Sequence, residues 1–231
     1  MAARQRRRVA VAIPAGGIGA RFGGRTPKQF VAVGGSPILL ATVRHFARHP
    51  EVGAIVVAAP PPYVERTRRL LARLGRRASI TVVAGGATRQ ESVGRALQAV
   101  PADAELIVVH DAVRPFITRA LIDAVVRAAG ETGAALCALP IAETVKRVRD
   151  GRVEATIDRE GLWAVQTPQA FRTALLREAH EKSRRDGFVG TDDAALVERL
   201  GAPVRVIPGL ESNLKITTRD DLRRARGRLG R

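Results

Sequence analysis

Short apolar runs alternate with amphipathic segments along the chain. The apolar runs have the length of β-strands and lie at 9–14, 54–59, 80–84, 106–110, 134–140 and 204–208. Between them, the spacing of apolar positions predicts helices at 38–48, 64–74, 90–100 and 119–131, the last capped by Thr118. Strands that alternate with helices are typical of a parallel sheet covered on its faces. The pattern therefore predicts one α/β domain over 1–231, built on a mostly parallel, Rossmann-like layered sheet.

One segment departs from this alternation and predicts a β-hairpin. Asp-Gly at 150–151 lies between two runs rich in β-branched residues, which is a strong signal for a two-residue hairpin turn. A protruding hairpin arm at about 141–160 would expose Val145, Val148 and Val153 unless another surface covers them. Two covers remain open here, a partner subunit and the protein's own sheet.

Composition excludes several classes of protein. No run in the 231 residues approaches the ~20 apolar residues of a membrane helix, which argues against a membrane protein. Cys137 is the only cysteine, so an intrachain disulfide and a cysteine-based zinc site are excluded, and a reducing, cytoplasmic setting fits. The arginines at 4–8 and the short apolar run after them imitate a signal peptide, but the run leads directly into a glycine-rich loop. We interpret it as a first strand.

The formal net charge of +17 raises the hypothesis of a nucleic-acid partner. The basic residues are almost all arginines and are spread over every segment, which is typical of solvated faces. Aromatic residues make up only 3%, which leaves little for base stacking, and no helix-turn-helix, zinc-finger or RNP sequence occurs. We therefore predict no specific nucleic-acid partner.

A loop with five glycines at 14–24 follows the first predicted strand. Glycine lets the backbone wrap closely around a polyphosphate with its N–H groups inward, and Arg21 and Lys28 add cations. A Walker A loop would need Gly-Lys-Ser/Thr, and a dinucleotide fingerprint would need glycine at Phe22. A merely structural turn explains the glycines but not both cations. The loop thus indicates a triphosphate site.

Further polar residues come directly after predicted strands, where α/β sheets bind their ligands. A second glycine turn, 85–86, precedes Arg89 and Ser92 and offers another backbone surface to a small ligand. Asp111 and Arg114 follow the fourth predicted strand; the alternative is that these two only pair with each other. The carboxyl edge of the sheet is therefore the predicted site.

Residue usage favours nucleotidyl or phosphoryl transfer. The chain has no Gly-x-Ser-x-Gly sequence, and we interpret His110 as a core histidine. Transfer of this kind needs mainly positioning and charge neutralisation. Because lysine is rare in this arginine-rich chain, Lys28 and Lys215 are predicted to meet a need for a compact cation, whereas Lys182 is predicted on a helix surface.

In order, these segments resemble the nucleotide-sugar-type nucleotidyltransferases, and more closely the 2-C-methyl-D-erythritol 4-phosphate cytidylyltransferase family of the non-mevalonate isoprenoid pathway. The resemblance spans almost the whole chain, and its segments are specific only in combination. They lie at 14–21, 27–29, 85–93, 110–115, 158–163, 166–169, 191–192 and 213–217.

The resemblance implies a reaction of CTP with the sugar-alcohol phosphate, with Mg²⁺ mainly on the triphosphate oxygens, to give a CDP-linked alcohol and pyrophosphate. Arg21 and Lys28 match residues that stabilise the pentacovalent α-phosphate. Arg159 and Lys215 match residues that hold the methylerythritol phosphate for in-line attack. A phosphate monoester is mostly dianionic at neutral pH, so the attack requires no general base.

The resemblance also implies two sets of binding residues and a homodimer. The nucleotide would lie along Ala15, Gly16, Gly17, Gly19, Gly86, Arg89 and Ser92. The second substrate would lie along Asp111, Arg114, Thr144, Thr167 and Thr191. The hairpin matches the family's dimer arm, so that Thr144 or Arg159 would act across the interface.

Three alternatives stay open on the sequence. Family members that accept ribitol 5-phosphate share the triphosphate loop, and two positions, Phe22 and Ala87, depart from the residues common in the family. An NAD-dependent oxidoreductase would need an acidic residue after the second strand, where the chain has prolines at 60–62. A basic RNA-binding module would bind RNA in a salt-sensitive way, with no particular need for Lys28.

Overall fold

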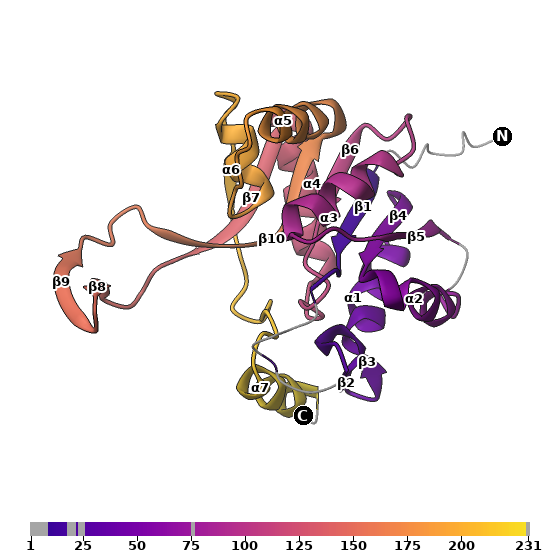
Figure 1. Cartoon of the computed structure of the whole chain (residues 1–231), viewed down its shortest axis with the longest axis horizontal. Helices are drawn as coiled ribbons and strands as arrows, with labels where there is room; N and C mark the ends of the chain where they lie inside the picture. Colours follow the sequence, from indigo (N-terminus) through magenta and orange to yellow (C-terminus); the bar gives the residue numbers. More distant parts are fainter. Residues whose placement is uncertain (1–8, 18–21, 23–25, 75–76, 230–231) are drawn as a thin grey trace.

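A seven-stranded sheet forms the centre of the protein, seen here in a computed structural model that describes residues 9–17, 22, 26–74 and 77–229 (Figure 1). The strand order is β11-β7-β10-β6-β1-β4-β5. All neighbours in the sheet pair in parallel except β10, which runs antiparallel to β6 and β7. The prediction of a mostly parallel α/β sheet is confirmed. The strands are β1 (Val9–Pro14), β4 (Val52–Ala59), β5 (Ser79–Ala84), β6 (Leu106–Val109), β7 (Ala134–Pro140), β10 (Trp163–Arg172) and β11 (Arg205–Pro208).

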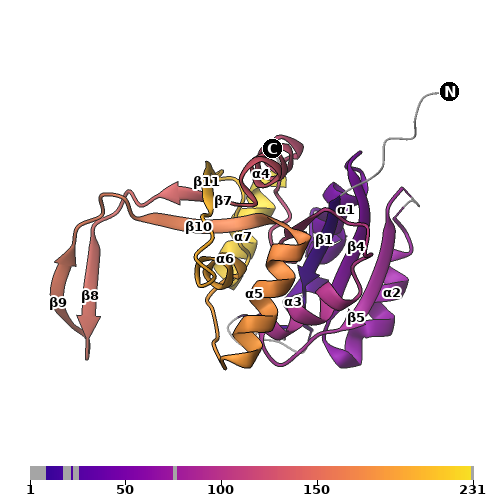
Figure 2. The ribbon, with the colours of Figure 1, turned by 90° about the horizontal axis from the view of Figure 1, so that it is seen from above.

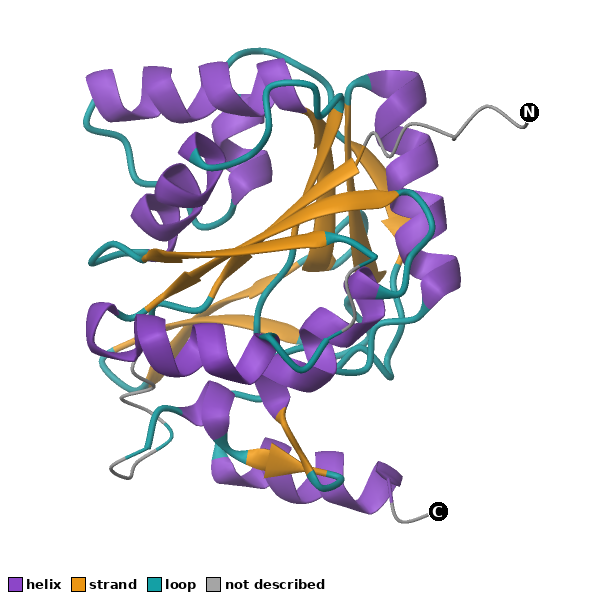
Figure 3. Ribbon diagram, turned by 90° about the vertical axis from the view of Figure 1, so that its right-hand side faces the viewer, coloured by secondary structure: helices purple, strands orange, loops and turns teal. Residues whose placement is uncertain are grey.

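Helices cover both faces of the sheet (Figure 3) because its central strands are apolar on both sides. Along β1, Val11 and Ile13 belong to the core on one face, and Ala10 and Ala12 to the core on the other. The first core receives residues of α1 (Ile38–Ala47), α2 (Val64–Leu71) and α4 (Arg119–Thr132). The second receives residues of α3 (Arg89–Gln98), α5 (Thr173–Arg185) and α6 (Asp193–Glu198). The Thr118 hydroxyl accepts a hydrogen bond from the N–H of Leu121 at 3.2 Å, so the predicted cap is confirmed.

A third, smaller core joins elements near the start of the chain to the last helix. It contains Phe22 together with residues of β2 (Ala32–Val33), α1 and α7 (Arg219–Leu229), and β2 pairs with β3 (Ser36–Pro37). The remaining short elements are the 3-10 helices η1 (Lys28–Phe30) and η2 (Pro61–Tyr63). No helix in the described ranges is long and apolar enough to cross a membrane.

The predicted hairpin stands away from the body as an arm made of β8 (Val145–Arg149) and β9 (Arg152–Ile157) (Figures 1 and 2). Asp150 and Gly151 have φ of 49° and 74°, which is the conformation that a tight hairpin turn requires. Val148 and Val153 are 57% and 63% exposed. The hairpin prediction is confirmed, and the alternative in which it folds back on its own sheet is wrong.

Candidate active site

A cavity of about 260 Å³ opens beyond the carboxyl ends of β1, β5 and β6. Its wall combines backbone of the two glycine segments with cationic side chains and one carboxylate. The structure therefore brings together most of the residues predicted from the strand ends. Those that line the cavity are Ala15, Gly16, Gly17, Lys28, Gly86, Arg89, Ser92, Asp111 and Lys215.

Lys28 is positioned by its neighbour in η1. The buried Gln29 amide donates a hydrogen bond to the Ala15 carbonyl at 2.8 Å and so ties η1 to the start of the glycine-rich loop. Predicted residues Gly19 and Arg21 lie outside the described part of the chain.

Ser92 lies where the two glycine segments approach each other. Its hydroxyl donates to the Thr88 carbonyl at 2.9 Å and accepts from the Gly86 N–H at 3.1 Å. A Cβ at Gly16 would come within 2.7 Å of the Ser92 Oγ, and a Cβ at Gly86 within 2.3 Å of the Glu91 Cβ. Only glycine allows this close approach, which leaves backbone groups at the cavity surface.

Asp111 is the electrostatic centre of the cavity. It is buried, with the Lys215 Nζ 2.7 Å from its Oδ2, the Arg89 Nε 3.1 Å from its Oδ1 and the Arg114 Nε 3.8 Å from its Oδ2. Burial acts to raise the pKa of Asp111, but these three cations outweigh burial and hold the pKa well below its ordinary value. Asp111 is thus ionised, and its closest partners are Lys215 and Arg89 rather than Arg114.

The segment that carries Lys215 is fixed by its neighbours. The Ile216 N–H donates to the Val113 carbonyl at 2.9 Å, and the buried Asn213 amide donates to the Thr167 carbonyl at 2.8 Å. Arg114 is buried and donates to the Asn213 carbonyl at 2.7 Å. Arg114 therefore joins Lys215's segment to Asp111 from beneath the cavity wall.

Asp193 is a buried site residue that the sequence analysis did not single out. Its Oδ2 accepts from the Arg89 Nη1 at 2.7 Å, and its Oδ1 lies 2.9 Å from the His180 Nε2. Burial acts to raise the pKa of Asp193, but the hydrogen bond from His180 and the charge of Arg89 outweigh burial and lower it. Arg89 is held between Asp193 and Asp111, and these two carboxylates raise its pKa against the effect of burial. The available signal was an acidic residue directly before the apolar run of α6.

His110 and Thr167 support Asp111 from behind. Burial lowers the pKa of His110 to about 4, so the ring is neutral near pH 7. Its Nε2 lies 3.1 Å from the Arg114 carbonyl, which can only accept, and this contact assigns the proton to Nε2. The Thr167 hydroxyl then donates to Nδ1 at 3.1 Å and accepts from the Asp111 N–H at 3.0 Å. The interpretation of His110 as a core histidine is confirmed, and Thr167 lies behind Asp111 rather than on the wall.

Because of His110, we expect the free energy of unfolding to decrease as the pH is lowered from about 6.5 to 4. The unfolded histidine binds a proton below pH 6.5, whereas the native one does so only near pH 4, so the unfolded state holds more protons in this window. The contribution is complete above pH 6.5 and amounts to at most about 3 kcal/mol. Urea unfolding at pH 7 and pH 4.5 would show a smaller loss in His110→Gln than in the wild type. An equal loss in both proteins would contradict the assignment.

Three predicted residues lie away from the cavity. Thr144 and Arg159 are exposed in the segments that flank the two strands of the arm, where the Arg159 guanidinium donates to the Ala142 carbonyl. Thr191 is exposed in the loop before α6. None of the three lines the cavity within this chain, and their roles stay predictions.

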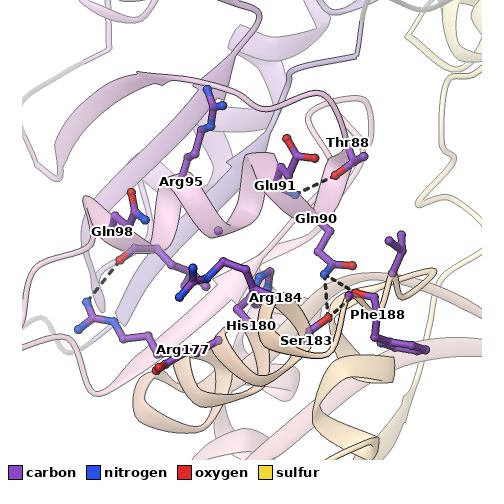
Figure 4. A pocket seen from close by; sticks show the side chains of 15 residues that line it. Thr88, Gln90, Glu91, Arg95, Gln98, Arg177, His180, Ser183, Arg184 and Phe188 are labelled. Atoms are coloured by element: carbon purple, nitrogen blue, oxygen red, sulfur yellow. Dashed lines mark hydrogen bonds between the residues drawn. The ribbon is translucent and has the colours of Figure 1, made fainter.

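A larger groove of about 860 Å³ lies beside the site between α3 and α5 (Figure 4). Polar groups of this groove hydrogen-bond to neighbouring parts of the protein: the Gln90 amide donates to the Ser183 Oγ at 2.9 Å and to the Phe188 carbonyl at 3.0 Å. Arg177 likewise donates to the Val100 carbonyl at 3.0 Å. The cations that converge on a carboxylate are in the smaller cavity, and we place the chemistry there.

Comparisons with known proteins identify the family of the chain. The sequence model of a family described as 2-C-methyl-D-erythritol 4-phosphate cytidylyltransferase matches residues 9–231. A relative of that name from Symbiobacterium thermophilum is 49% identical over 219 residues, covering 94% of this chain and 91% of the relative. Another, from Solibacter usitatus, is 46% identical over 226 residues, covering 93% of each chain.

Solved structures give the same result. The crystal structure of 2-C-methyl-D-erythritol 4-phosphate cytidylyltransferase from Thermus thermophilus is similar, with a TM-score of 0.79, 38% identity and coverage of 96% of this chain and 98% of that one. The 4-diphosphocytidyl-2C-methyl-D-erythritol synthase of Anaerococcus prevotii has a TM-score of 0.84 at 30% identity, with the same coverage. The chain therefore belongs to the 2-C-methyl-D-erythritol 4-phosphate cytidylyltransferase family.

Proposed function

We propose that the protein transfers the cytidylyl group of CTP to 2-C-methyl-D-erythritol 4-phosphate and releases pyrophosphate, a step in isoprenoid precursor biosynthesis. The observation that carries this proposal is the convergence of Lys28, Lys215 and Arg89 with glycine backbone in one cavity. Family membership favours this reaction over the ribitol phosphate, hydride-transfer and RNA-binding alternatives.

The reaction is an in-line displacement at the α-phosphorus of CTP. An oxygen of the acceptor's phosphate monoester forms the new P–O bond, and the bond to the β-phosphate breaks, with its electron pair leaving on pyrophosphate. Because the attacking group is already an anion, the barrier lies in bringing anions together and in the extra charge of the transition state. Lys28 of η1, with Arg21 of the glycine-rich loop, is proposed to stabilise the α-phosphate.

Lys215 is proposed to bind the acceptor phosphate, together with Arg159. Its 2.7 Å contact with Asp111 holds the ammonium at the cavity surface before substrate arrives. Asp111, in turn, is oriented by Arg89 and by the Thr167 hydroxyl on its N–H. Preorganisation of this kind lets the cations act without a large rearrangement during the reaction.

Mg²⁺ is proposed to be carried mainly by the triphosphate oxygens. The lining fits this arrangement, because Mg²⁺ takes oxygen ligands from one or two carboxylates and substrate phosphates, and Asp111 is the carboxylate on the described wall. No cluster of three or more metal-ligating side chains occurs among the residues that the structure describes. When bound, the ion neutralises charge on the triphosphate.

A homodimer through the arm is proposed to complete the site. Thr144 and Arg159 flank the strands of the arm and lie outside the cavity of their own chain, while Val148 and Val153 present an apolar surface that a partner subunit would cover. In such a dimer, each arm would bring Arg159 to the neighbour's cavity.

The reaction is tested by pyrophosphate release with Mg²⁺. CTP, ATP, GTP and UTP are each paired with methylerythritol 4-phosphate or ribitol 5-phosphate. We expect release only with CTP and methylerythritol 4-phosphate. Preference for ribitol 5-phosphate, or for another nucleotide, would overturn the proposed acceptor or base.

Arg159→Ala is expected to raise KM for the acceptor by about tenfold or more and to leave KM for CTP unchanged, since a charged hydrogen bond to the acceptor phosphate is lost. Mixing Arg159→Ala with Lys28→Ala subunits should restore activity if Arg159 acts on the neighbour's site, because one site of the mixed dimer then has both cations. A mixed dimer without restored activity would place Arg159 in the site of its own chain.

A further inference from the structure

A second charged cleft lies at the opposite edge of the sheet from the candidate active site. α1 ends at Ala47 and leads into β4, and α2 ends at Leu71 and leads into β5. The carboxyl ends of both helices therefore lie at the edge where the parallel strands begin, whereas the active-site cavity lies where they end. Between the two helix ends is a cleft of about 490 Å³, which we call the α1–α2 cleft.

Four arginines dominate the lining of the α1–α2 cleft: Arg44, Arg48, Arg73 and Arg77. The other lining residues, such as Leu74, are apolar, and no carboxylate belongs to the described wall. The cleft thus combines a concentrated positive charge with a nonpolar floor.

The arginines of this cleft have no counter-charge in the described parts of the protein. Arg44 donates to the Ser36 Oγ at 3.1 Å, and Arg77 donates to the Arg48 carbonyl at 3.2 Å, both neutral acceptors. The arginines on the exposed face of α2 do have a counter-charge: Arg68 and Arg69 both pair with Glu65. Single arginines elsewhere, such as Arg95 and Arg172, also bond only to backbone carbonyls, but the cleft gathers four arginines around one cavity.

Helix capping explains only part of this arrangement. Cations are favourable at helix carboxyl ends, and the bond from Arg77 to the Arg48 carbonyl is such a contact. Capping does not require four side chains around one cavity, where like charges repel one another. A bound anion would relieve this repulsion.

We propose that the α1–α2 cleft binds the oligophosphate group of a small molecule, at a site separate from the active site. The planar guanidinium group matches phosphate oxygens in bidentate geometry, and several such groups suit a chain of phosphoryl groups. The volume lies within the range of small-molecule sites, and Leu40, Ala47 and Leu74 would contact a less polar part of the ligand.

Calorimetric titration with inorganic triphosphate tests this proposal. The variant Arg48→Gln/Arg73→Gln removes two charges that no described carboxylate balances, and Arg68→Gln/Arg69→Gln is the matched control on the exposed face of α2. We expect two equivalents to bind to the wild type and the control, one in each cavity. The cleft variant should bind one, with the second site weakened at least about tenfold. Its kcat and KM for CTP should equal those of the wild type.

The result separates this proposal from the proposed function. If only the active-site assignment failed, the wild type would bind one equivalent and the cleft variant none. Equal stoichiometry in wild type and cleft variant would overturn the cleft proposal, as would capture of an RNA duplex without uptake of triphosphate. Arg48→Lys/Arg73→Lys, which keeps the charge, should retain the second equivalent with weaker affinity. Repeating the titration with ATP distinguishes a nucleotide, which would bind more tightly, from phosphate alone.

Discussion

Replacing Lys28 with alanine is expected to lower kcat by about 10²–10³-fold and to leave the unfolding temperature unchanged. Lys28 lines the cavity, while its neighbours Gln29 and Phe30 carry the contacts that hold η1 on the body. Removing its ammonium therefore takes charge from the reacting phosphate without opening the core. Pyrophosphate release and thermal unfolding, measured on the same preparation, separate the two effects.

Lys182→Ala is the matched control for Lys28. Lys182 lies on α5 and its Nζ contacts the Asp186 carboxylate at 2.9 Å, as expected for the helix-surface position predicted from the sequence. Its replacement should leave kcat within about twofold of the wild-type value, because a surface ion pair contributes little to the stability of the fold. Wild-type turnover in Lys28→Ala would remove Lys28 from the mechanism.

The sequence predicted the elements whose apolar pattern is simple. β1 and β4 are nearly continuous apolar runs, and α1 and α4 show a clear helical period. β10 was missed because polar residues and a proline, at 166–169, interrupt its pattern inside the sheet. The polar sequence of α5 hid its one buried face in the same way.

The site was predictable as far as strand ends determine it. Arg89 and Asp111 follow the ends of β5 and β6, and parallel strands bring those ends together. Lys28 lies farther along the chain, in η1, and was predicted from the glycine-rich loop that precedes it. The contacts among them were not predictable, because Arg89 meets Asp193 across 104 positions of sequence and Asp111 meets Lys215 across a comparable span. Such pairs depend on how separate elements pack, and no local pattern encodes them.

Asp111→Asn is expected to lower both the free energy of unfolding and the turnover of the enzyme. The amide keeps the shape of the carboxylate but carries no charge, so Lys215, Arg89 and Arg114 lose their common counter-charge. An amide also presents N–H donors to cations that need an acceptor. Breaking a buried ion pair by removing one partner costs about 3–5 kcal/mol. Because Lys215 is partly exposed, most of that cost should arise at Arg89 and Arg114.

The pH dependence identifies this effect as electrostatic. The native pKa of Asp111 lies below its ordinary value of 3.8, so its contribution to stability is present above about pH 4 and is lost as the pH falls further. Urea unfolding should show Asp111→Asn destabilised at pH 7 and closer to the wild type near pH 3. Asp186→Asn, which removes an exposed carboxylate paired with Lys182 and Arg199, should leave turnover unchanged. Equal destabilisation of Asp111→Asn at both pH values would mean that packing, not charge, is what Asp111 supplies to the site.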